Sequence, residues 1–311
     1  MTTPIRLGLI GAGRWGRNYI RTIAELEGMR LAGIASRNPE TARMVQPGCA
    51  VFADWRNLLN KNEIDGVVIA APAPRHAEMV RAAIEARLPA LVEKPLTLDL
   101  AEAIALRDVA ISNGGFFMVG HTHLFHPAYR ALKAMAPNYG PVCAIRSEAG
   151  NYGPYRPDTP VLWDWGPHDV ALCLDLLGAM PEHVRANVAE RRPVEGAMGE
   201  IIKMSLEFSG GVRADIRFGN LMPKRRWFAV HLEKAVLIYD DLAPAKLTRH
   251  QSTRAYAAPT DSGVPVDISA ELPLTNAVKA FETAIRSGKY DPAHMQLGVR
   301  VIDVLSQSLL S

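Results

Sequence analysis

Three side chains in two short segments have the types and spacing needed for proton transfer near a polar ligand. Asp164 and His168 stand four residues apart in Trp163-Asp164-Trp165-Gly166-Pro167-His168-Asp169, and Lys94 lies in Glu93-Lys94-Pro95 after an apolar run. A neutral imidazole accepts a proton, an ammonium group stabilises negative charge that develops on oxygen, and a carboxylate orients such a pair. These residue types indicate acid–base chemistry, with Lys94, Asp164 and His168 as the catalytic candidates.

The helix expected around His168 bears on its protonation. Pro167 is typical of a first helical residue and Gly178 of a helix end, so we expect a helix over 168–177 with His168 in its first turn. The positive helix end and a nearby lysine both disfavour imidazolium. In the alternative interpretation Asp164 is only an N-cap, His168 is a hydrogen-bonded buried histidine, and the lysine lies on the surface.

A glycine-rich segment near the start of the chain predicts the cofactor. It follows the apolar run 5–10 and opens a helix-like segment over 17–26. Its first glycine permits a tight turn, its second lets the backbone approach a pyrophosphate, and its third lets the helix pack against the strand. This place between a strand and a helix favours dinucleotide binding over an ordinary turn in a parallel sheet. The residues are Gly11, Ala12, Gly13, Arg14, Trp15 and Gly16.

The choice of dinucleotide depends on the residues about 20 positions after the glycine segment. An acidic side chain there holds the 2′-hydroxyl of the ribose, whereas an arginine accommodates a 2′-phosphate. The chain has Ser36-Arg37-Asn38 and no acid at this place. Ser36 and Arg37 therefore favour NADP, and NAD remains the alternative if Arg37 only faces solvent.

Three histidines in His121-Thr122-His123-Leu124-Phe125-His126 resemble a metal cluster. On a strand His121 and His123 would share one face. The segment has no carboxylate or cysteine to complete a metal site, so no metal is predicted. We expect instead that one of these histidines, His121, lines the cofactor cleft.

The elements that position these residues fall into two domains. In 1–122, short continuous apolar runs over 31–35, 66–70, 89–93 and 116–119 are typical of parallel strands covered on both faces. Helix patterns lie between them over 77–87 and 98–112. The sequence therefore predicts an α/β, doubly wound (Rossmann) NAD(P)-binding domain over 1–122, followed by a substrate-binding and oligomerisation domain over 123–311.

The pattern of the second domain predicts an α+β fold with a largely antiparallel open sheet. A hairpin is expected at 208–212, a loop over 251–266, and terminal helices over 276–286 and 294–309. Because 227–232 carries apolar residues in both alternating sets, we expect the open sheet face to build a homodimer or homotetramer. The expected strands are 142–149, 184–190, 201–208, 212–218, 227–232 and 235–239.

Composition excludes several classes of function. The 311 residues carry a net charge of +3 and no long block of Lys and Arg, which argues against nucleic-acid binding. No run reaches the ~18 apolar residues of a membrane span. The three widely spaced cysteines predict neither disulfides nor a zinc motif. With 48% hydrophobic and 22% charged residues, we expect a cytoplasmic globular enzyme.

Taken together, these motifs resemble the Gfo/Idh/MocA family, that of glucose–fructose oxidoreductase and inositol dehydrogenase. The resemblance covers nearly the whole chain. Besides the glycine segment it includes Ala71-Pro72-Ala73-Pro74-Arg75-His76, Glu93-Lys94-Pro95, and Asp164 with His168. In the family, the matching lysine, aspartate and histidine surround the reacting carbon. The resemblance thus implies catalytic roles for Lys94, Asp164 and His168, and cofactor contacts from Ala71, Pro72, His76 and Glu93.

Finer features resemble the branch of the family that acts on nucleotide sugars. They are Gly120 to Pro127, Leu162 to Val170, Met222-Pro223-Lys224 and Tyr239-Asp240-Asp241. The resemblance implies an NAD(P)-dependent oxidoreductase of a sugar or nucleotide-sugar carbinol, working as a homo-oligomer. Two alternatives stay open, an NAD-dependent glycoside hydrolase that oxidises its sugar transiently and a non-catalytic dinucleotide sensor. Retention of all three catalytic candidates argues against the sensor, which needs only the glycine segment.

Overall fold

The computed structural model describes residues 3–60 and 62–308, which form two compact units. The first unit comprises Met1–Thr122 and Leu274–Ile302, and the second comprises His123–Pro273 and Asp303–Ser311. The sequence pattern predicts that all of 123–311 belongs to the second domain, whereas α6 (Pro273–Ser287) and most of α7 (Pro292–Gln307) group with the first unit. Their grouping follows from close packing, because a Cβ at Gly66 would lie 2.7 Å from Ile285 and one at Gly298 2.6 Å from Val119.

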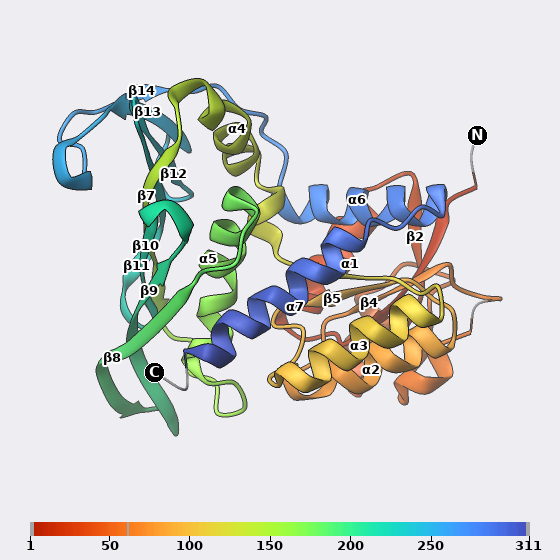
Figure 1. Cartoon of the computed structure of the whole chain (residues 1–311). Coiled ribbons are helices and arrows are strands. Elements are labelled where there is room, and N and C mark those ends of the chain that lie inside the picture. The colour runs from red at the N-terminus through yellow and green to blue at the C-terminus, as the bar shows by residue number, and fades with distance from the viewer. Residues whose placement is uncertain (1–2, 61, 309–311) are drawn as a thin grey trace. The chain divides into compact units, whose positions relative to one another are not determined.

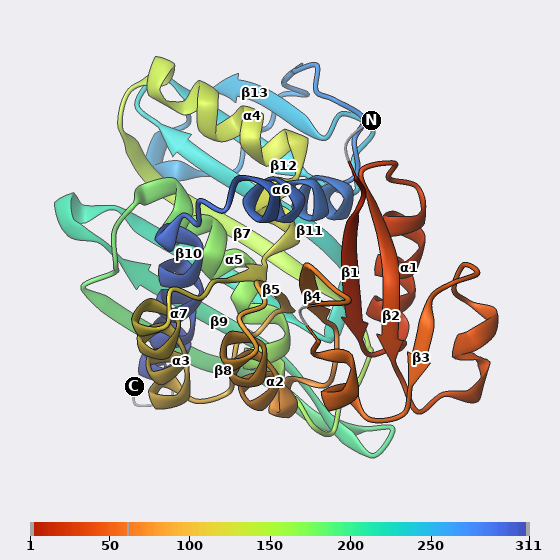
Figure 2. The same cartoon turned by 90° about the vertical axis from the view of Figure 1, so that its right-hand side faces the viewer.

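The first unit is built on a six-stranded parallel sheet, which confirms the predicted doubly wound fold (Figures 1 and 2). Its strand order, β3-β2-β1-β4-β5-β6, reverses direction between β1 and β4, where ligands bind in open α/β sheets. The strands are β1 (Ile5–Ile10), β2 (Met29–Ala35), β3 (Ala50–Phe52), β4 (Gly66–Ile69), β5 (Ala90–Glu93) and β6 (Phe117–Gly120). The helices are α1 (Arg14–Ala24), α2 (His76–Glu85) and α3 (Leu100–Ser112), with 3-10 turns at Pro39–Arg43, Trp55–Leu58 and Ala73–Arg75.

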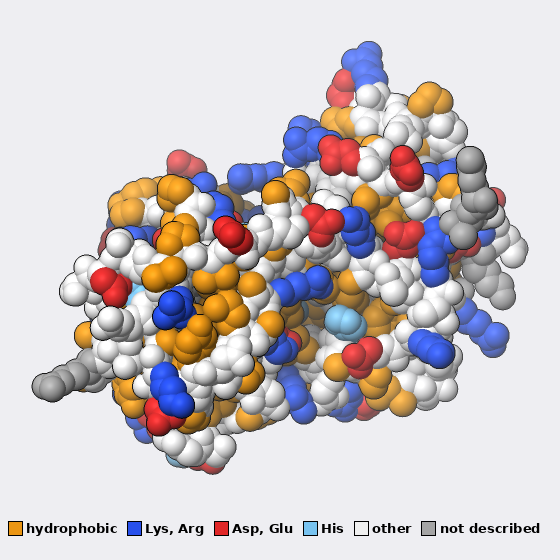
Figure 3. All heavy atoms as spheres, turned by 90° about the horizontal axis from the view of Figure 1, so that it is seen from above, with side chains coloured by type: hydrophobic (Ala, Val, Ile, Leu, Met, Phe, Trp, Pro, Cys, Tyr) orange, Lys and Arg blue, Asp and Glu red, His pale blue; other side chains and the backbone are white. Residues whose placement is uncertain are grey.

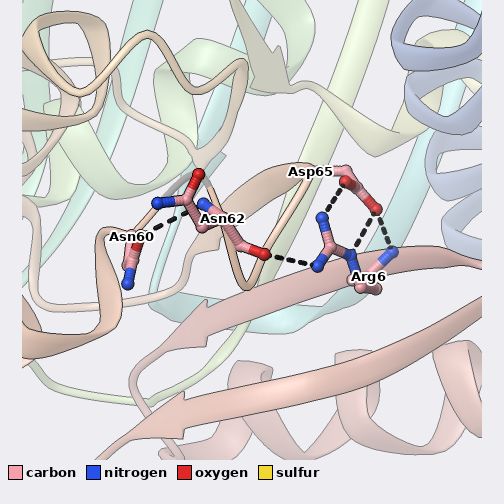
Figure 4. A network of polar contacts seen from close by, with 4 residues as sticks. All are labelled: Arg6, Asn60, Asn62 and Asp65. Carbon is pink, nitrogen blue, oxygen red and sulfur yellow. Dashed lines mark hydrogen bonds and ion pairs between the residues drawn. The ribbon is translucent and has the colours of Figure 1, made fainter.

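A polar network fixes the edge of this sheet opposite the carboxyl ends of the strands (Figure 4). Arg6 at the start of β1 makes a two-pronged contact with Asp65 just before β4, with Nη2 2.7 Å from Oδ1 and Nε 3.2 Å from Oδ2. Arg6 Nη1 also donates to the carbonyl oxygen of Asn62 at 2.6 Å. The hydrogen bond from Arg6 outweighs partial burial and lowers the pKa of Asp65. This pairing sets the register of the two central strands.

The second unit is an eight-stranded sheet with α4 (Pro127–Met135) and α5 (Val161–Leu177) on one face (Figure 1). All strand pairs are antiparallel except β10 with β7, which confirms the predicted largely antiparallel α+β domain. The sheet order is β14-β13-β12-β11-β7-β10-β9-β8. The strands are β7 (Val142–Tyr152), β8 (His183–Val194), β9 (Ala197–Glu207), β10 (Arg213–Gly219), β11 (Leu221–Leu232), β12 (Ala235–Asp240), β13 (Leu247–Gln251) and β14 (Val264–Pro265).

The structure corrects several element boundaries. The helix expected over 168–177 begins at Val161, so Pro167 lies inside it rather than at its start. The strands β3, β13 and β14 and helix α4 were not expected; Val264–Pro265 pairs with β13 within the predicted loop. The last terminal helix ends at Gln307, and Leu309, its predicted end, lies outside the described residues.

Two surface properties complete the description. No helix among residues 3–60 and 62–308 is long and apolar enough to cross a membrane. On the face shown in Figure 3, basic and acidic side chains are interspersed rather than gathered into one block. That distribution agrees with the small net charge of the chain.

Candidate active site

The glycine segment forms an open cradle at the carboxyl end of β1. The amide of Gly11 donates to the carbonyl oxygen of Ala35 at 2.9 Å, which ties the turn to the end of β2. Gly11 has φ +101°, and a Cβ on Gly16 would lie 2.0 Å from the Gly11 carbonyl oxygen, so neither position accepts a side chain without a shift. A Cβ on Gly13, by contrast, would meet nothing within 4 Å.

The start of α1 is therefore open for an anion. Gly13 is the N-cap and provides no side-chain cap to the first amides of the helix, while Arg14 is exposed and Trp15 half-buried beside it. Free amides at a helix N-terminus together with the positive end of its dipole suit phosphate oxygens. The local geometry fits a dinucleotide pyrophosphate.

Ser36 and Arg37 follow β2 directly and so lie beside the glycine cradle. The Ser36 hydroxyl accepts from the amide of Asn38 at 3.1 Å and from the Thr41 hydroxyl at 2.9 Å, which fixes its position. Arg37 is exposed, and in the described part of the chain no carboxylate pairs with its guanidinium group. A guanidinium group available at this edge suits a phosphate better than a bare ribose hydroxyl.

His76 joins two loops at the same sheet edge. Its Nδ1 lies 2.7 Å from the carbonyl oxygen of Pro95, and its Nε2 lies 2.9 Å from that of Ala71, which with Pro72 follows β4. Burial and the charge of Lys94 lower the pKa of His76, although hydrogen bonds to the two carbonyl oxygens act in the opposite sense. Both ring nitrogens are engaged with backbone, so His76 holds the loop that carries Lys94. Its predicted cofactor contact stays a prediction.

Glu93 ends β5 and Lys94 follows it, beside the end of β6 and His121. Glu93 is buried and its Oε1 accepts from the Tyr19 hydroxyl of α1 at 2.8 Å. Lys94 is half-buried, and its charge lowers the pKa of both His76 and His121, so its ammonium group lies near both rings. Tyr19 was not predicted, because its contact with Glu93 joins residues 74 positions apart.

His121 is buried without a polar partner from the described residues. Neither ring nitrogen makes a hydrogen bond there, and burial together with the Lys94 charge lowers its pKa to about 3. A buried, neutral imidazole without a hydrogen bond lowers the free energy of unfolding by roughly 1–3 kcal/mol. Such a group beside a lysine at the carboxyl edge of the sheet suits a polar ligand atom.

In the second unit, α5 presents Asp164 and His168 one turn apart. Because the helix begins at Val161 with Pro160 as N-cap, the interpretation of Asp164 as an N-cap is wrong. His168 lies in the third turn, so the expected influence of the helix N-terminus on its protonation is also wrong. Both residues are about 9% exposed, and residues at i and i+4 share one helix face.

An unpredicted arginine pairs with Asp164. Arg156, from the loop 153–160 before α5, has its Nε 3.3 Å from Asp164 Oδ2. In the sequence, the only signal for this ion pair is an arginine in a loop of mixed polar and aromatic residues. The pair fixes the carboxylate one turn before His168.

The ring of His168 contacts His123, which forms a polar cluster with His126, Tyr239 and Asp241. The His123 and His168 rings are nearly perpendicular, at 85°, with centroids 5.0 Å apart. The expectation that His121 and His123 share a strand face is wrong, because β6 ends at Gly120 and Thr122–Phe125 is a 3-10 turn. His121 and His123 also belong to different units.

The predicted residues are thus positioned by two elements. The carboxyl edge of the six-stranded sheet brings together the glycine segment, Ser36, Arg37, Ala71, Pro72, His76, Glu93, Lys94 and His121. Helix α5 carries Asp164 and His168 in the other unit. Within the described residues, no three His, Cys, Asp or Glu side chains gather so as to hold a metal ion.

Two family models match the two parts of the chain. The model of an oxidoreductase family with an NAD-binding Rossmann fold matches residues 5–121. The model of the GFO/IDH/MocA C-terminal domain matches residues 136–238. The family resemblance drawn from the motifs is confirmed by both matches.

Relatives in the same group are named dehydrogenases. The chain is 35% identical over 190 residues to UDP-N-acetylglucosamine 3-dehydrogenase of Acidithiobacillus ferrooxidans. The matched segment covers 58% of this chain and 57% of that protein. The chain is 34% identical over 135 residues to inositol 2-dehydrogenase of Acidothermus cellulolyticus, covering 42% and 40% of the two chains. The matched segments therefore span about half the length of these relatives.

Solved structures match over nearly the full length. A candidate oxidoreductase from Magnetospirillum magnetotacticum MS-1 superimposes with a TM-score of 0.94 at 46% identity, covering 98% of this chain and 99% of that chain. The Acidithiobacillus ferrooxidans UDP-N-acetylglucosamine 3-dehydrogenase superimposes with a TM-score of 0.83 at 25% identity, covering 99% and 98%. The fold is shared along the whole chain.

Proposed function

The chain belongs to the GFO/IDH/MocA family of NAD-binding oxidoreductases, and from this premise we propose that it transfers a hydride between a sugar-type carbinol carbon and a nicotinamide cofactor. The observation that carries the proposal is the presence of two complementary parts. One is the sheet edge that carries the open turn at Gly13 together with Lys94 and His121, and the other is the Asp164–His168 face of α5. A dinucleotide sensor requires only the first part.

Each residue has a distinct role in the proposed reaction. His168 takes the hydroxyl proton of the substrate as its carbon is oxidised, and returns it in the reverse direction. Lys94 stabilises the negative charge that develops on the same oxygen. Asp164, held by Arg156 at 3.3 Å, orients His168 from the preceding helical turn. Proton transfer and charge stabilisation each contribute about 10²–10⁴-fold to the rate.

The proposed cofactor contacts come from the sheet edge of the first unit. Gly11, Ala12, Gly13, Arg14, Trp15 and Gly16 hold the pyrophosphate at the start of α1, and Ser36 with Arg37 holds the adenosine ribose. Ala71, Pro72, His76, Glu93 and His121 shape the edge where the nicotinamide end is expected. When bound, the nicotinamide supplies the hydride chemistry.

The proposed substrate is a sugar, with a nucleotide sugar favoured. The two similar proteins named above act on UDP-N-acetylglucosamine and on inositol, both of which present ring carbinols. Three of the four motifs that resemble the nucleotide-sugar branch lie at Gly120 to Pro127, on α5 and at Tyr239-Asp240-Asp241, and contribute to the polar cluster beside His168. The fourth, Met222-Pro223-Lys224, lies on β11.

An absorbance assay at the reduced-nicotinamide band tests the proposed function. The purified protein is incubated with NADP or NAD and, in parallel, with free sugars, inositols and nucleotide sugars. We expect reduced nicotinamide to accumulate with at least one carbinol substrate. Release of a free sugar without net cofactor reduction identifies the glycoside hydrolase instead. Cofactor binding without turnover of any carbinol contradicts the proposal and favours a sensor.

Replacing Arg37 by alanine is expected to weaken NADP(H) binding and to leave NAD(H) binding nearly unchanged. Arg37 is exposed at the end of β2, where only NADP carries a phosphate. Loss of one charge-assisted hydrogen bond corresponds to ~1.5–3 kcal/mol, or roughly 10- to 150-fold in Kd. Titration calorimetry with both cofactors measures the effect, with Arg43→Ala, an exposed arginine on the following turn, as the control. Equal weakening of both cofactors contradicts the assignment of Arg37.

We expect a homodimer or homotetramer built through the open sheet face. That face is more charged than the strand pattern predicted, and it contains a hollow of about 750 Å³ whose lining includes Glu148, Lys203, Asp215, Arg217 and Trp227. Cations and carboxylates interspersed on one face are complementary to a second copy of the same face. Light scattering should therefore give two or four times the chain mass of 34.0 kDa.

Salt and charge reversal sharpen this expectation. Exposed ion pairs weaken as salt screens them, so high salt should shift the unsubstituted protein towards monomer. Arg217→Glu should do the same at low salt, and its difference from the unsubstituted protein should shrink as salt rises. Arg107→Glu, at a half-buried arginine on α3 in the first unit, is the matched control. A monomeric mass at micromolar concentration for the unsubstituted protein contradicts the expectation.

A further inference from the structure

Tyr239 is hydrogen-bonded to His123 in the polar cluster beside His168. Its ring on β12 is 1% exposed, and its hydroxyl lies 2.9 Å from Nδ1 of His123. Burial, reinforced by the nearby carboxylate of Asp241, raises the pKa of Tyr239, so the phenol keeps its proton. A phenol that donates to Nδ1 leaves the His123 proton on Nε2 and favours the neutral ring.

A second histidine holds the other side of the Tyr239 ring. His126 accepts from the amide of Ala128 through Nδ1 at 3.0 Å, so its own proton sits on Nε2, which lies 3.3 Å from Asp241 Oδ1. The His126 and Tyr239 ring centroids are 4.7 Å apart. The Tyr239 ring thus contacts two imidazoles, that of His123 through its hydroxyl and that of His126 through its ring.

The ring of His123 also contacts the ring of His168, the proposed base. The His123 ring stands at 85° to that of His168 with centroids 5.0 Å apart, so the edge of one ring faces the plane of the other. Whether His123 is charged therefore matters for His168, since a cation at this distance disfavours a second proton nearby. The charged groups that influence Tyr239 are Asp241, Arg226, Asp169 and Asp240. Asp241 also interacts electrostatically with His123 and Lys246.

We propose that His123, held by the hydroxyl of Tyr239, is a positioning residue that fixes the ring plane of His168 and, by staying neutral, preserves its ability to accept a proton. This inference rests on the proposed function, in which His168 is the base. His123 and Tyr239 touch neither the reacting carbon nor the cofactor in this scheme. Their effect passes through His168 alone.

Nitrogen-15 NMR of the imidazole rings tests the inference on the protein without cofactor or substrate. Tyr239→Phe removes one oxygen atom and keeps the ring against His126. We expect His123 to lose its single-tautomer signature and to titrate at higher pH than before, while His168 titrates at lower pH. Tyr129→Phe is the matched control, because Tyr129 is equally buried in the same unit but its hydroxyl contacts Asp175 at 2.7 Å.

Steady-state kinetics provide the second measurement. With a substrate found as described above, Tyr239→Phe should lower kcat about 10-fold with KM within about twofold, because a displaced base slows chemistry and not binding. In the pH profile of kcat, the acid limb should shift in the same direction as the His168 titration measured by NMR. His123→Asn is the second variant, since its amide oxygen still accepts from Tyr239 although the ring facing His168 is gone; it should lower kcat similarly.

The outcomes separate this inference from the proposed function. Unchanged His123 and His168 titrations in Tyr239→Phe, or equal changes in Tyr129→Phe, overturn the inference even if His168→Asn is inactive. Full activity of His168→Asn overturns the proposed function, and the positioning role with it, whatever the titrations show. If Tyr239→Phe does not fold, the test is made with His123→Asn. An unchanged His168 titration and an unchanged kcat in that variant overturn the inference.

Discussion

Replacing His168 by asparagine is expected to lower kcat by about 10²-fold or more while the protein still folds and binds its dinucleotide. Asparagine keeps polarity but cannot accept a proton near neutral pH. Lys94→Met should have a comparable effect, because methionine retains the length of the side chain and removes the charge that stabilises the substrate oxygen. Single-turnover rates and melting curves on the same samples separate catalysis from stability.

The double variant gives the sharper result. If His168 and Lys94 act on one oxygen in one transition state, their losses should combine less than additively. Lys289→Met is a suitable control for the lysine change, since it removes an exposed lysine of the same unit in the loop between α6 and α7. If His168→Asn melts early yet keeps its rate per folded molecule, His168 is not the base. His121 or Lys94 would then be the remaining candidates.

The first unit was predictable because its signals are local. Gly11 to Gly16 specify a turn by what a Cβ would strike, and short apolar runs specify strands buried on both faces. The carboxyl edge then follows from topology, so Ser36, Lys94 and His121 could be placed there from sequence position alone. The grouping of α6 and α7 with this unit was not predictable, because it depends on packing between residues far apart in the chain.

The start of α5 shows why a local rule failed. Proline commonly opens a helix because it lacks the amide that would be unbonded there, so Pro167 suggested a start at that position. The apolar and buried residues from Val161 to Trp165 instead continue the helix backwards to Pro160. Burial outweighs the one hydrogen bond that Pro167 cannot donate. His168 therefore lies in the third turn of the helix and not in the first turn, where it was predicted.

The polar surroundings of His168 could not be read from the sequence at all. Tyr239 lies 116 residues after His123, and no spacing rule connects a strand residue with a 3-10 turn at that distance. Arg156 and Asp164 lie only eight residues apart, but a loop of irregular backbone separates them. Such contacts depend on tertiary structure, which explains why the sequence predicted the reacting groups but not the groups that hold them.

Replacing Gly13 by valine is expected to raise the Kd of the dinucleotide by at least about 10-fold, or ~1.4 kcal/mol, with little loss of folding stability. The physical reason is the empty space around this residue. A Cβ at Gly13 meets no atom within 4 Å, and φ −69° is open to any L-residue, so the side chain enters the volume proposed for the pyrophosphate and touches nothing else. Titration calorimetry and a melting curve measure the two quantities.

Gly16→Ala is the contrasting variant on the same helix. Its Cβ would lie 2.0 Å from the Gly11 carbonyl oxygen, so backbone must shift, and both stability and binding should fall together. Gly13→Val thus tests whether the cofactor occupies the space beside the turn, whereas Gly16→Ala tests whether the turn itself tolerates a side chain. If Gly13→Val binds the dinucleotide as tightly as the unsubstituted chain, the pyrophosphate does not approach this turn. The helix N-terminus would then be an ordinary end of α1, and the Arg37 assignment, which depends on the same orientation of the cofactor, would fall with it.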